Sequence, residues 1–144
     1  MLKGILAISG KPGLFKLITN AKNSIIVESL LDGKRMPAYA TSKISSLEDI
    51  SIFTVEGDVK LADVFASIFE KKVELNPKKA SANDLKKAFK EVLPDYDDER
   101  VYVSDIKKVF SWFNLLKEKD VINAESIEEL KKEDNAESEE STNS

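Results

Sequence analysis

The sequence contains neither cysteine nor histidine. Without cysteine, the chain can form no disulfide bond, no zinc site with thiolate ligands and no cysteine nucleophile. Without histidine, every catalytic triad that depends on an imidazole base is excluded. A chain without disulfides fits a reducing compartment, so these two absences favour a cytoplasmic protein.

Long hydrophobic runs are also missing from the sequence. No apolar run approaches the roughly 18 consecutive residues that a membrane-spanning helix needs. The first ten residues, MLKGILAISG, are too short and too weakly apolar for a signal peptide. We therefore expect a cytoplasmic protein with no membrane association.

The charge that the chain does carry is unevenly distributed. Its 144 residues are 42% apolar, enough for one domain or for two small modules that share a core, and the net charge is −4. Residues 1–47 carry a net +5, residues 48–118 carry −3 and residues 119–144 carry −6. This asymmetry indicates either that the basic part binds an anionic partner or that the acidic tail competes for its surface. Charge that only keeps the protein soluble is the simpler alternative.

The first third of the chain alternates apolar runs with turn residues, which is typical of short β-strands. The Asp32-Gly33 pair predicts a type I′ hairpin turn, which needs positive φ at both residues. Pro37 lies inside a predicted strand and indicates an edge position or a bulge, since proline donates no backbone hydrogen bond. Ile44–Asp49 is expected to be a connector with at most one helical turn. The five predicted strands are Lys3–Ser9, Leu14–Thr19, Ser24–Leu31, Lys34–Thr41 and Ile50–Val55.

After Gly57 the apolar period changes from two to 3.6 residues, which indicates helices. The predicted fold class is therefore α+β: a small five-stranded SH3-like barrel or a bent antiparallel sheet, followed by a helical module. Ser81 with Asp84 predicts one helix start, and Ser104 predicts another. The predicted divisions are a β-rich small barrel module (1–57), a connecting helix (58–74), a helical module (80–120) and an acidic, largely disordered tail (121–144).

Three short motifs allow both a chemical and a structural interpretation. The GKPG sequence at residues 10–13 lacks the spacing of a phosphate-binding Walker loop, which favours a tight turn. Ser104 and Lys107 form an SxxK spacing without the further motifs of penicillin-recognising enzymes, which favours a helix start. Residues 95–99, DYDDE, resemble an EF-hand loop but place Arg100 where that loop needs glycine, so we expect a solvated loop. We expect no catalytic residue, no metal site and no cofactor.

Most aromatic residues between positions 89 and 113 follow the apolar stripe of a helix. Trp112 lies about 200° around the helix from Phe110, at the edge of that stripe or off it. An exposed tryptophan beside Tyr102 would be an anchor for a partner protein, and packing against the β module is the alternative. The candidate partner-binding residues are Trp112, Tyr102 and, at an exposed strand edge, Pro37.

One grouping is typical of small barrels that bind nucleic acid with basic grooves and stacked aromatic rings. Phe15 and Tyr39 accompany four basic residues in the predicted strands and turns. Phe15 and Lys16 are adjacent and point to opposite faces of their strand, which weakens this interpretation. The candidate nucleic-acid-binding residues are Lys16, Lys22, Lys34 and Arg35.

Several segments read in order resemble one known family. They are ILAISGKPGLFKLI, IIVESLLDGKRMPAYA, ISSLEDISIFT, KKASANDLKKAFKEVLPDYDDERVYVSDIKKVFSWFNLL and the acidic tail. The chain from Met1 to Leu116 is similar to a family of small uncharacterised bacterial proteins that carry a domain of unknown function. This resemblance implies a β-rich amino-terminal part, a helical carboxyl-terminal part and a bacterial cytoplasmic setting. It implies no activity and no site residues.

These observations favour a non-enzymatic, cytoplasmic protein-interaction or adaptor protein. The alternative is a weak RNA- or DNA-binding protein that uses the basic face of the β module. An enzyme with a carboxylate–lysine site is a third hypothesis, although no such pair can be placed in one pocket from the sequence. The sequence leaves open which protein partner is bound and whether the chain forms a homo-oligomer.

Overall fold

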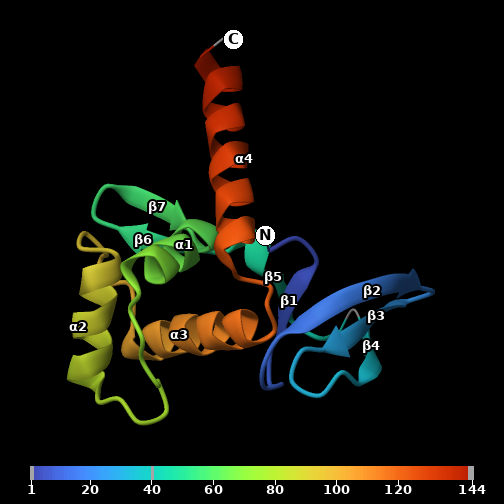
Figure 1. The fold of residues 1–144 in the computed structure, drawn as a ribbon. Helices are drawn as coiled ribbons and strands as arrows, with labels where there is room; N and C mark the ends of the chain where they lie inside the picture. Colours follow the sequence, from blue (N-terminus) through green and yellow to red (C-terminus); the bar gives the residue numbers. More distant parts are fainter. Residues whose placement is uncertain (1, 40, 143–144) are drawn as a thin grey trace.

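The computed structural model describes the backbone of residues 2–39 and 41–142, with side chains up to Glu133. Its first part is a bent antiparallel sheet of five strands, and its second part combines a two-stranded sheet with helices (Figure 1). The strands of the first sheet lie in the order β4-β3-β2-β1-β5. They are β1 (Ile5–Ile8), β2 (Phe15–Ala21), β3 (Ser24–Ser29), β4 (Arg35–Tyr39) and β5 (Ile44–Ser46).

A short 3-10 helix, η1 (Leu47–Asp49), leads from the bent sheet into the second part. There β6 pairs with β7, and four α-helices follow among the described residues. None of the described helices is both long enough and apolar enough to span a bilayer. The elements are β6 (Ser51–Thr54), β7 (Gly57–Lys60), α1 (Leu61–Lys71), α2 (Ala82–Val92), α3 (Val103–Glu118) and α4 (Ala124–Thr142).

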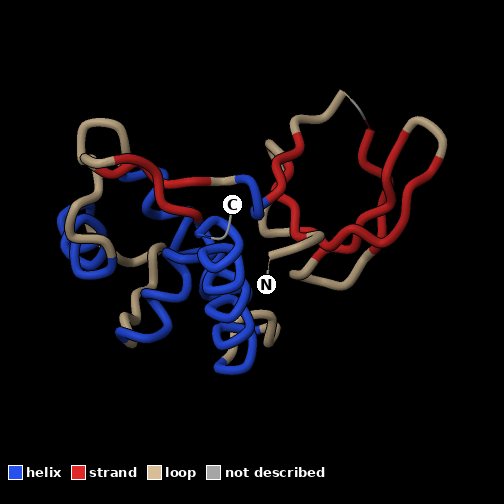
Figure 2. Tube along the Cα trace, turned by 90° about the horizontal axis from the view of Figure 1, so that it is seen from above, coloured by secondary structure: helices blue, strands red, loops and turns tan. Residues whose placement is uncertain are grey.

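The five-stranded sheet is bent but not closed, so the α+β class and the bent sheet are confirmed and the SH3-like barrel is wrong. Its edge strands β4 and β5 do not pair with each other, and Figure 2 shows how this part curves. The physical reason is that β5 has three residues and η1 then carries the chain away, so no strand joins the two edges. Phe15, Val27 and Ala38 fill the inner face of the bend as a small separate core. Pro37 lies in an edge strand, as predicted.

The predicted fifth strand, Ile50–Val55, forms but belongs to the other sheet. It becomes β6 and pairs with β7, which lies partly in the predicted connecting helix 58–74. Thr54 stabilises the turn between them, since its Oγ1 donates to the Gly57 carbonyl (2.7 Å) and accepts from the Glu56 amide (3.3 Å). The strand that completes the bent sheet is β5, in the predicted connector. The two parts of the chain therefore meet at η1 rather than at residue 57.

The hairpin predicted at Asp32-Gly33 joins β3 to β4, but its turn type is wrong. Only Gly33 of this pair has positive φ (74°), whereas a type I′ turn needs two such residues. The loop is longer, and the Ser29 amide closes it by donating to the Lys34 carbonyl (2.9 Å). The Asp32 carboxylate accepts from the Lys34 amide (2.9 Å), which explains how aspartate stabilises this loop.

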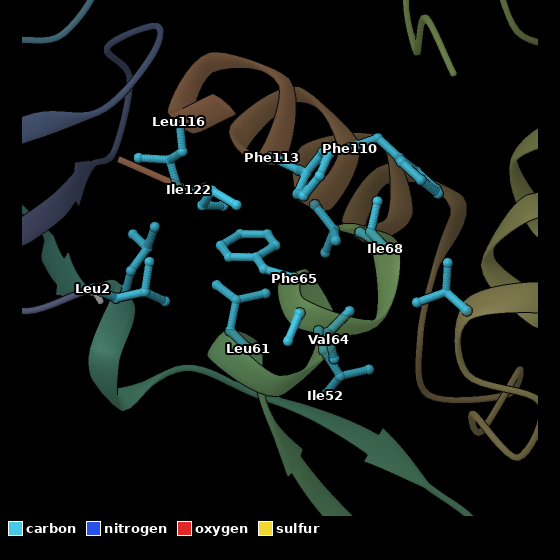
Figure 3. Close-up of a cluster of buried hydrophobic side chains, with 14 of the residues drawn as sticks. Leu2, Ile52, Leu61, Val64, Phe65, Ile68, Phe110, Phe113, Leu116 and Ile122 are labelled. Carbon is cyan, nitrogen blue, oxygen red and sulfur yellow. The ribbon is translucent and has the colours of Figure 1, made fainter. Parts of the chain in front are cut away.

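Helix α1 lies at the centre of the main core and does more than connect two modules (Figure 3). Leu61, Phe65 and Ile68 follow helical spacing and are fully buried. The Phe65 ring packs against Phe113 of α3, with ring centroids 6.1 Å apart. Leu2 belongs to the same buried cluster. The amino-terminal part therefore contributes residues to the main core of the helical part, in addition to its own small core.

The start of α2 is as predicted, and the start of α3 is not. The Asp84 amide donates to Ser81 Oγ (3.1 Å) and the Ser81 amide donates to Asp84 Oδ2 (3.3 Å), which is a capping box. At α3 the amide of Tyr102 donates to Asp105 Oδ2 (3.0 Å). Tyr102 is therefore the N-cap residue of α3, and Ser104 lies inside the first turn of the helix instead of capping it.

The acidic tail predicted for residues 121–144 contains α4, and its first turns are ordered by the core. Ile127 and Leu130 are 4% and 7% exposed and pack in the main cluster. The helix starts with a reciprocal cap, in which the Ser126 amide donates to Asn123 Oδ1 (2.8 Å) and the Asn123 amide donates to Ser126 Oγ (2.9 Å). An Asn-x-x-Ser cap lacks the usual Glu or Gln at its fourth position, so the sequence pattern did not reveal it. Figure 1 shows α4 extending away from the rest of the chain.

Gly13 lies against Leu31, and we expect Gly13→Ala to lower the free energy of unfolding by about 2 kcal/mol. An added Cβ would lie 2.6 Å from Leu31 Cδ1, and the residue has a φ of +76°, so close contact adds to backbone strain. Gly10→Ala is the matched control, since its φ is +82° with nothing within 4 Å; it should cost about 1 kcal/mol. Urea denaturation measures both variants, and equal losses would contradict the role of the contact.

Candidate binding cleft

A cleft of about 1460 Å³ lies between the bent sheet and the helical part. One wall comes from β5 and residues 9–13, the opposite wall comes from α3, and residues 74–78 complete the lining. Asn114 holds this last segment against α3, because its Nδ2 donates to the Leu75 carbonyl (2.9 Å). In Figure 1 the bent sheet lies on one side of α3, and α2 lies on the other side, away from the bent sheet.

A largely polar stripe of α3 lines the cleft, because the apolar side of the helix is buried in the main core. Ile106, Phe110 and Phe113 are buried in the main cluster, while residues three or four positions apart on the other side line the cleft. At a rise of 1.5 Å per residue, the stripe from 104 to 118 is about 21 Å long. Its polar members are Ser104, Lys107, Lys108, Ser111 and Glu118. Leu115, which is buried in the main cluster, borders the stripe.

Lysines dominate the charge of this cleft. Only Glu74 and Glu118 oppose them among the described lining residues, which leaves an excess of four positive charges. The whole chain has a net charge of −4, so the cleft is basic although the protein as a whole is acidic. A concave site with charges of one sign raises the local concentration of oppositely charged ligands. The six lysines are Lys11, Lys43, Lys78, Lys107, Lys108 and Lys117.

Trp112 lies where the cleft meets a smaller pocket. The indole is partly buried and packs against the main core. It lines both the cleft and an adjoining pocket of about 230 Å³, to which Phe53 and Arg100 also contribute. Leu115 and Ile50 add further apolar surface to the cleft. The site therefore combines apolar contact area with a surplus of lysines.

The three candidate partner-binding residues do not form one surface. Tyr102 is 66% exposed, but it precedes Trp112 by ten residues, or about 15 Å along the helix axis. Pro37 is exposed in β4, at the opposite edge of the bent sheet from β5. Trp112 is thus the member of this set that lines the cleft.

The four candidate nucleic-acid-binding residues are also separated. Lys16 and Arg35 share one face of the sheet, but Glu28 lies opposite both in the register and pairs with Arg35 (Nε–Oε1, 3.6 Å). Lys22 and Lys34 lie in turns at opposite ends of β3. None of these four is among the described residues that line the cleft. The basic surface expected on the sheet is therefore dispersed and partly neutralised.

None of the six cleft lysines is among the candidate binding residues of the sequence analysis. Lys43, Lys78 and Lys117 lie in separate segments, so no local pattern connects them. Lys107 and Lys108 could have been identified from the sequence, because they lie opposite the apolar stripe of α3. A search for polar stripes opposite the core stripe of α3 would have found this pair.

The GKPG turn forms, and it does not present a phosphate cradle. The Lys11 amide donates to the Ile8 carbonyl (3.1 Å) and Pro12 has no amide hydrogen. The Lys11 ammonium lies 3.3 Å from the Met36 sulfur. The turn therefore contributes a cationic side chain to the edge of the cleft.

The acidic loop that resembles an EF-hand is held by contacts within the protein. Asp97 accepts from Arg100 Nε (2.8 Å) and from the Glu99 amide (3.0 Å), and Arg100 lies over the Phe53 ring at 4.4 Å. The hydrogen bond from Arg100 is the main reason why the pKa of Asp97 is lowered. Burial, followed by the charge of Asp98, raises the pKa of Tyr96 in the same loop. Within the described residues, no cluster of three or more acidic side chains is placed to hold a metal ion.

Comparison with known proteins assigns both parts of the chain to domains without a known function. A family model described as "Domain of unknown function (DUF5606)" matches residues 2–47, and one described as "Domain of unknown function (DUF6852)" matches residues 50–116. The matches meet at η1, where the bent sheet gives way to the second part. No curated protein matches the chain.

A solved structure supports the same assignment. It is a solution NMR structure from Bacteroides vulgatus, obtained by a structural genomics consortium, and it is 46% identical to this chain. The match covers 85% of this chain and 90% of the other, with a TM-score of 0.71. The resemblance inferred from the sequence is thereby confirmed. This chain belongs to the family of proteins that carry these domains of unknown function.

Proposed function

We propose that this protein is a non-enzymatic interaction protein and that its cleft holds a negatively charged segment of a partner. The observation that carries the proposal is the convergence of six lysines from four separate segments on one concave surface. Trp112 and Leu115 add apolar area in the same place. Such a combination supports both attraction of an anionic partner and retention once it is bound.

The size and chemistry of the cleft favour binding over catalysis. Its volume of about 1460 Å³ exceeds the roughly 300–1,000 Å³ that is typical of small-molecule sites. Its described titratable groups are six lysines and two glutamates, and the chain has no histidine or cysteine to supply an imidazole or a thiolate. A macromolecular segment fits this surface better than a small substrate.

Fluorescence anisotropy with a fluorescein-labelled oligomer of twelve glutamates tests the proposal. We expect saturable binding at low ionic strength, with affinity that falls as NaCl rises, because exposed charges are screened. Trp112 is the single tryptophan of the chain and lines the cleft, so its emission should change along the same titration.

An oligomer of twelve lysines is the matched control. With a net charge of −4, non-specific attraction would favour the cationic oligomer over the anionic one. Preference for oligoglutamate with a tryptophan response supports a locally basic binding site. Preference for oligolysine, or no binding of oligoglutamate at any ionic strength, overturns the proposal.

A further inference from the structure

We infer that the partner segment is the acidic end of helix α4 from a second copy of this chain, held in the basic cleft by glutamates on one face of that helix. This inference rests on the proposed function and names the occupant of the same cleft. Three features of the molecule support it: the direction of α4, the charge of its second half, and the length of the face that carries this charge.

Helix α4 leaves the body of the protein after its first two turns. Ile127 and Leu130 are buried in the main cluster, and the Lys131 ammonium pairs with the Glu70 carboxylate of α1. Beyond these contacts the helical backbone continues to Thr142. Figure 1 shows this part extending away from α3 and from the bent sheet, which supply the two main walls of the cleft. The end of α4 is therefore presented to other molecules and not to the cleft of its own chain.

The sequence from Glu133 onwards is strongly acidic. Residues 133–144 contain five carboxylate side chains and no lysine or arginine, which gives a net charge of −5. The described lining of the cleft has an excess of four positive charges. Whole chains of net charge −4 repel each other, so two copies associate only through local surfaces of opposite charge. Complementary charge of this kind determines which surfaces meet.

Four glutamates of α4 follow helical spacing and form what we call the acidic face. Positions 129, 133, 137 and 140 are separated by four, four and three residues, and the sequence has glutamate at each. This spacing places them within about 80° around the helix. At 1.5 Å per residue, the acidic face is about 16 Å long. Glu129 and Glu133 are exposed, so the face is open to solvent where it begins.

The cleft has the dimensions and the cations to hold this face. Lys107 and Lys117 of α3 both line it, and ten residues correspond to about 15 Å along the helix axis. Three further lysines come from the other segments of the lining, namely Lys11, Lys43 and Lys78. A helix about 10 Å wide and 16 Å long occupies about 1,300 Å³, close to the cleft volume of about 1460 Å³. The acidic face can therefore lie along α3 with lysines on more than one side.

Sedimentation velocity of the full chain tests the inference. At low ionic strength we expect the average mass to rise above that of one copy as the protein concentration rises, because association follows mass action. High NaCl should return the mass to one copy, since it screens the charges. Trp112 lines the cleft, so its emission should change over the same range of concentration. A chain that stays monomeric at every concentration overturns the inference.

Two full-length variants with the same change in charge test the acidic face. One alters the face itself and the other alters acidic residues elsewhere around α4: they are E133Q/E137Q/E140Q and E128Q/D134N/E139Q. We expect the first variant to weaken self-association at least tenfold more than the second, because only the first changes the face that lies along α3. Equal weakening by both variants overturns the docking of this face. Circular dichroism on heating verifies that both variants fold.

A mixture of two variants tests whether α4 and the cleft meet each other. The Lys107→Glu/Lys108→Glu variant has an altered cleft and an unchanged α4, whereas E133Q/E137Q/E140Q has an unchanged cleft and an altered α4. We expect each variant alone to be monomeric at concentrations where the unmodified chain associates. Their equimolar mixture should form a complex with one copy of each. Absence of this complex overturns the inference.

The oligoglutamate titration separates failure of this inference from failure of the proposed function. A chain that binds oligoglutamate but stays monomeric keeps the proposed function, overturns the inference and takes its acidic segment from another protein. Self-association that persists at high NaCl and in both altered variants uses another surface and also overturns the inference alone. Absence of oligoglutamate binding overturns the proposed function and, with it, this inference.

Discussion

Replacement of Phe65 with alanine is expected to lower the free energy of unfolding by about 4 kcal/mol. The Phe65 side chain is fully buried in α1, in the middle of the main cluster (Figure 3). Its ring packs against Phe113 of α3, and α1 also shares the cluster with Leu2 at the amino terminus. The substitution removes a large apolar surface and leaves a cavity in the main cluster.

Urea unfolding followed by the fluorescence of the single tryptophan measures this loss. Tyr102→Ala is the control, because Tyr102 is aromatic but 66% exposed; its substitution should change stability by no more than about 0.5 kcal/mol. If the two variants lose similar stability, α1 does not lie at the centre of the core and the assignment is wrong.

Reversal of two charges in the cleft is expected to weaken binding of oligoglutamate roughly thirtyfold. Lys107 and Lys108 are exposed on α3 and both line the cleft. In water, two unit charges 4 Å apart interact by about 1 kcal/mol, and salt reduces this further. Changing both lysines to glutamate replaces attraction by repulsion and should cost about 2 kcal/mol in binding.

The double variant Lys86→Glu/Lys87→Glu is the matched control for this experiment. These neighbouring lysines are exposed on α2, which lies on the side away from the bent sheet (Figure 1), and they do not line the cleft. Both double variants change the net charge by the same amount, so a general electrostatic effect would weaken binding equally. Anisotropy titrations at fixed ionic strength decide between a local and a general effect, with thermal unfolding to verify that both variants fold.

Local elements were predictable wherever the interactions that stabilise them are close in sequence. The two residues of the capping box, Ser81 and Asp84, are three positions apart, so the local pattern predicted the start of α2 correctly. The β3–β4 hairpin was predicted from Asp32-Gly33, although the turn type was wrong. That error arose because the turn is set by the pairing of Ser29 with Lys34, outside the dipeptide.

The candidate site was much less predictable than the fold. Trp112 was singled out because it departs from the apolar stripe of its helix, and the structure places it at the cleft. Its predicted companions, Tyr102 and Pro37, lie elsewhere. Lys43 and Lys107 are 64 positions apart in the sequence. No local pattern in either segment predicts that the two lysines line the same cleft.

The sequence by itself determined the order of elements: short alternating strands first, then amphipathic helices, because strand and helix periods depend on residues within a few positions. Only the tertiary structure decided that the sheet stays open, that β6 joins β7, and that α3 faces β5 across a basic cleft. These features depend on which apolar faces of distant segments bury each other. Such long-range packing places side chains from distant segments together, and neither their charge nor their spacing in the chain encodes that proximity.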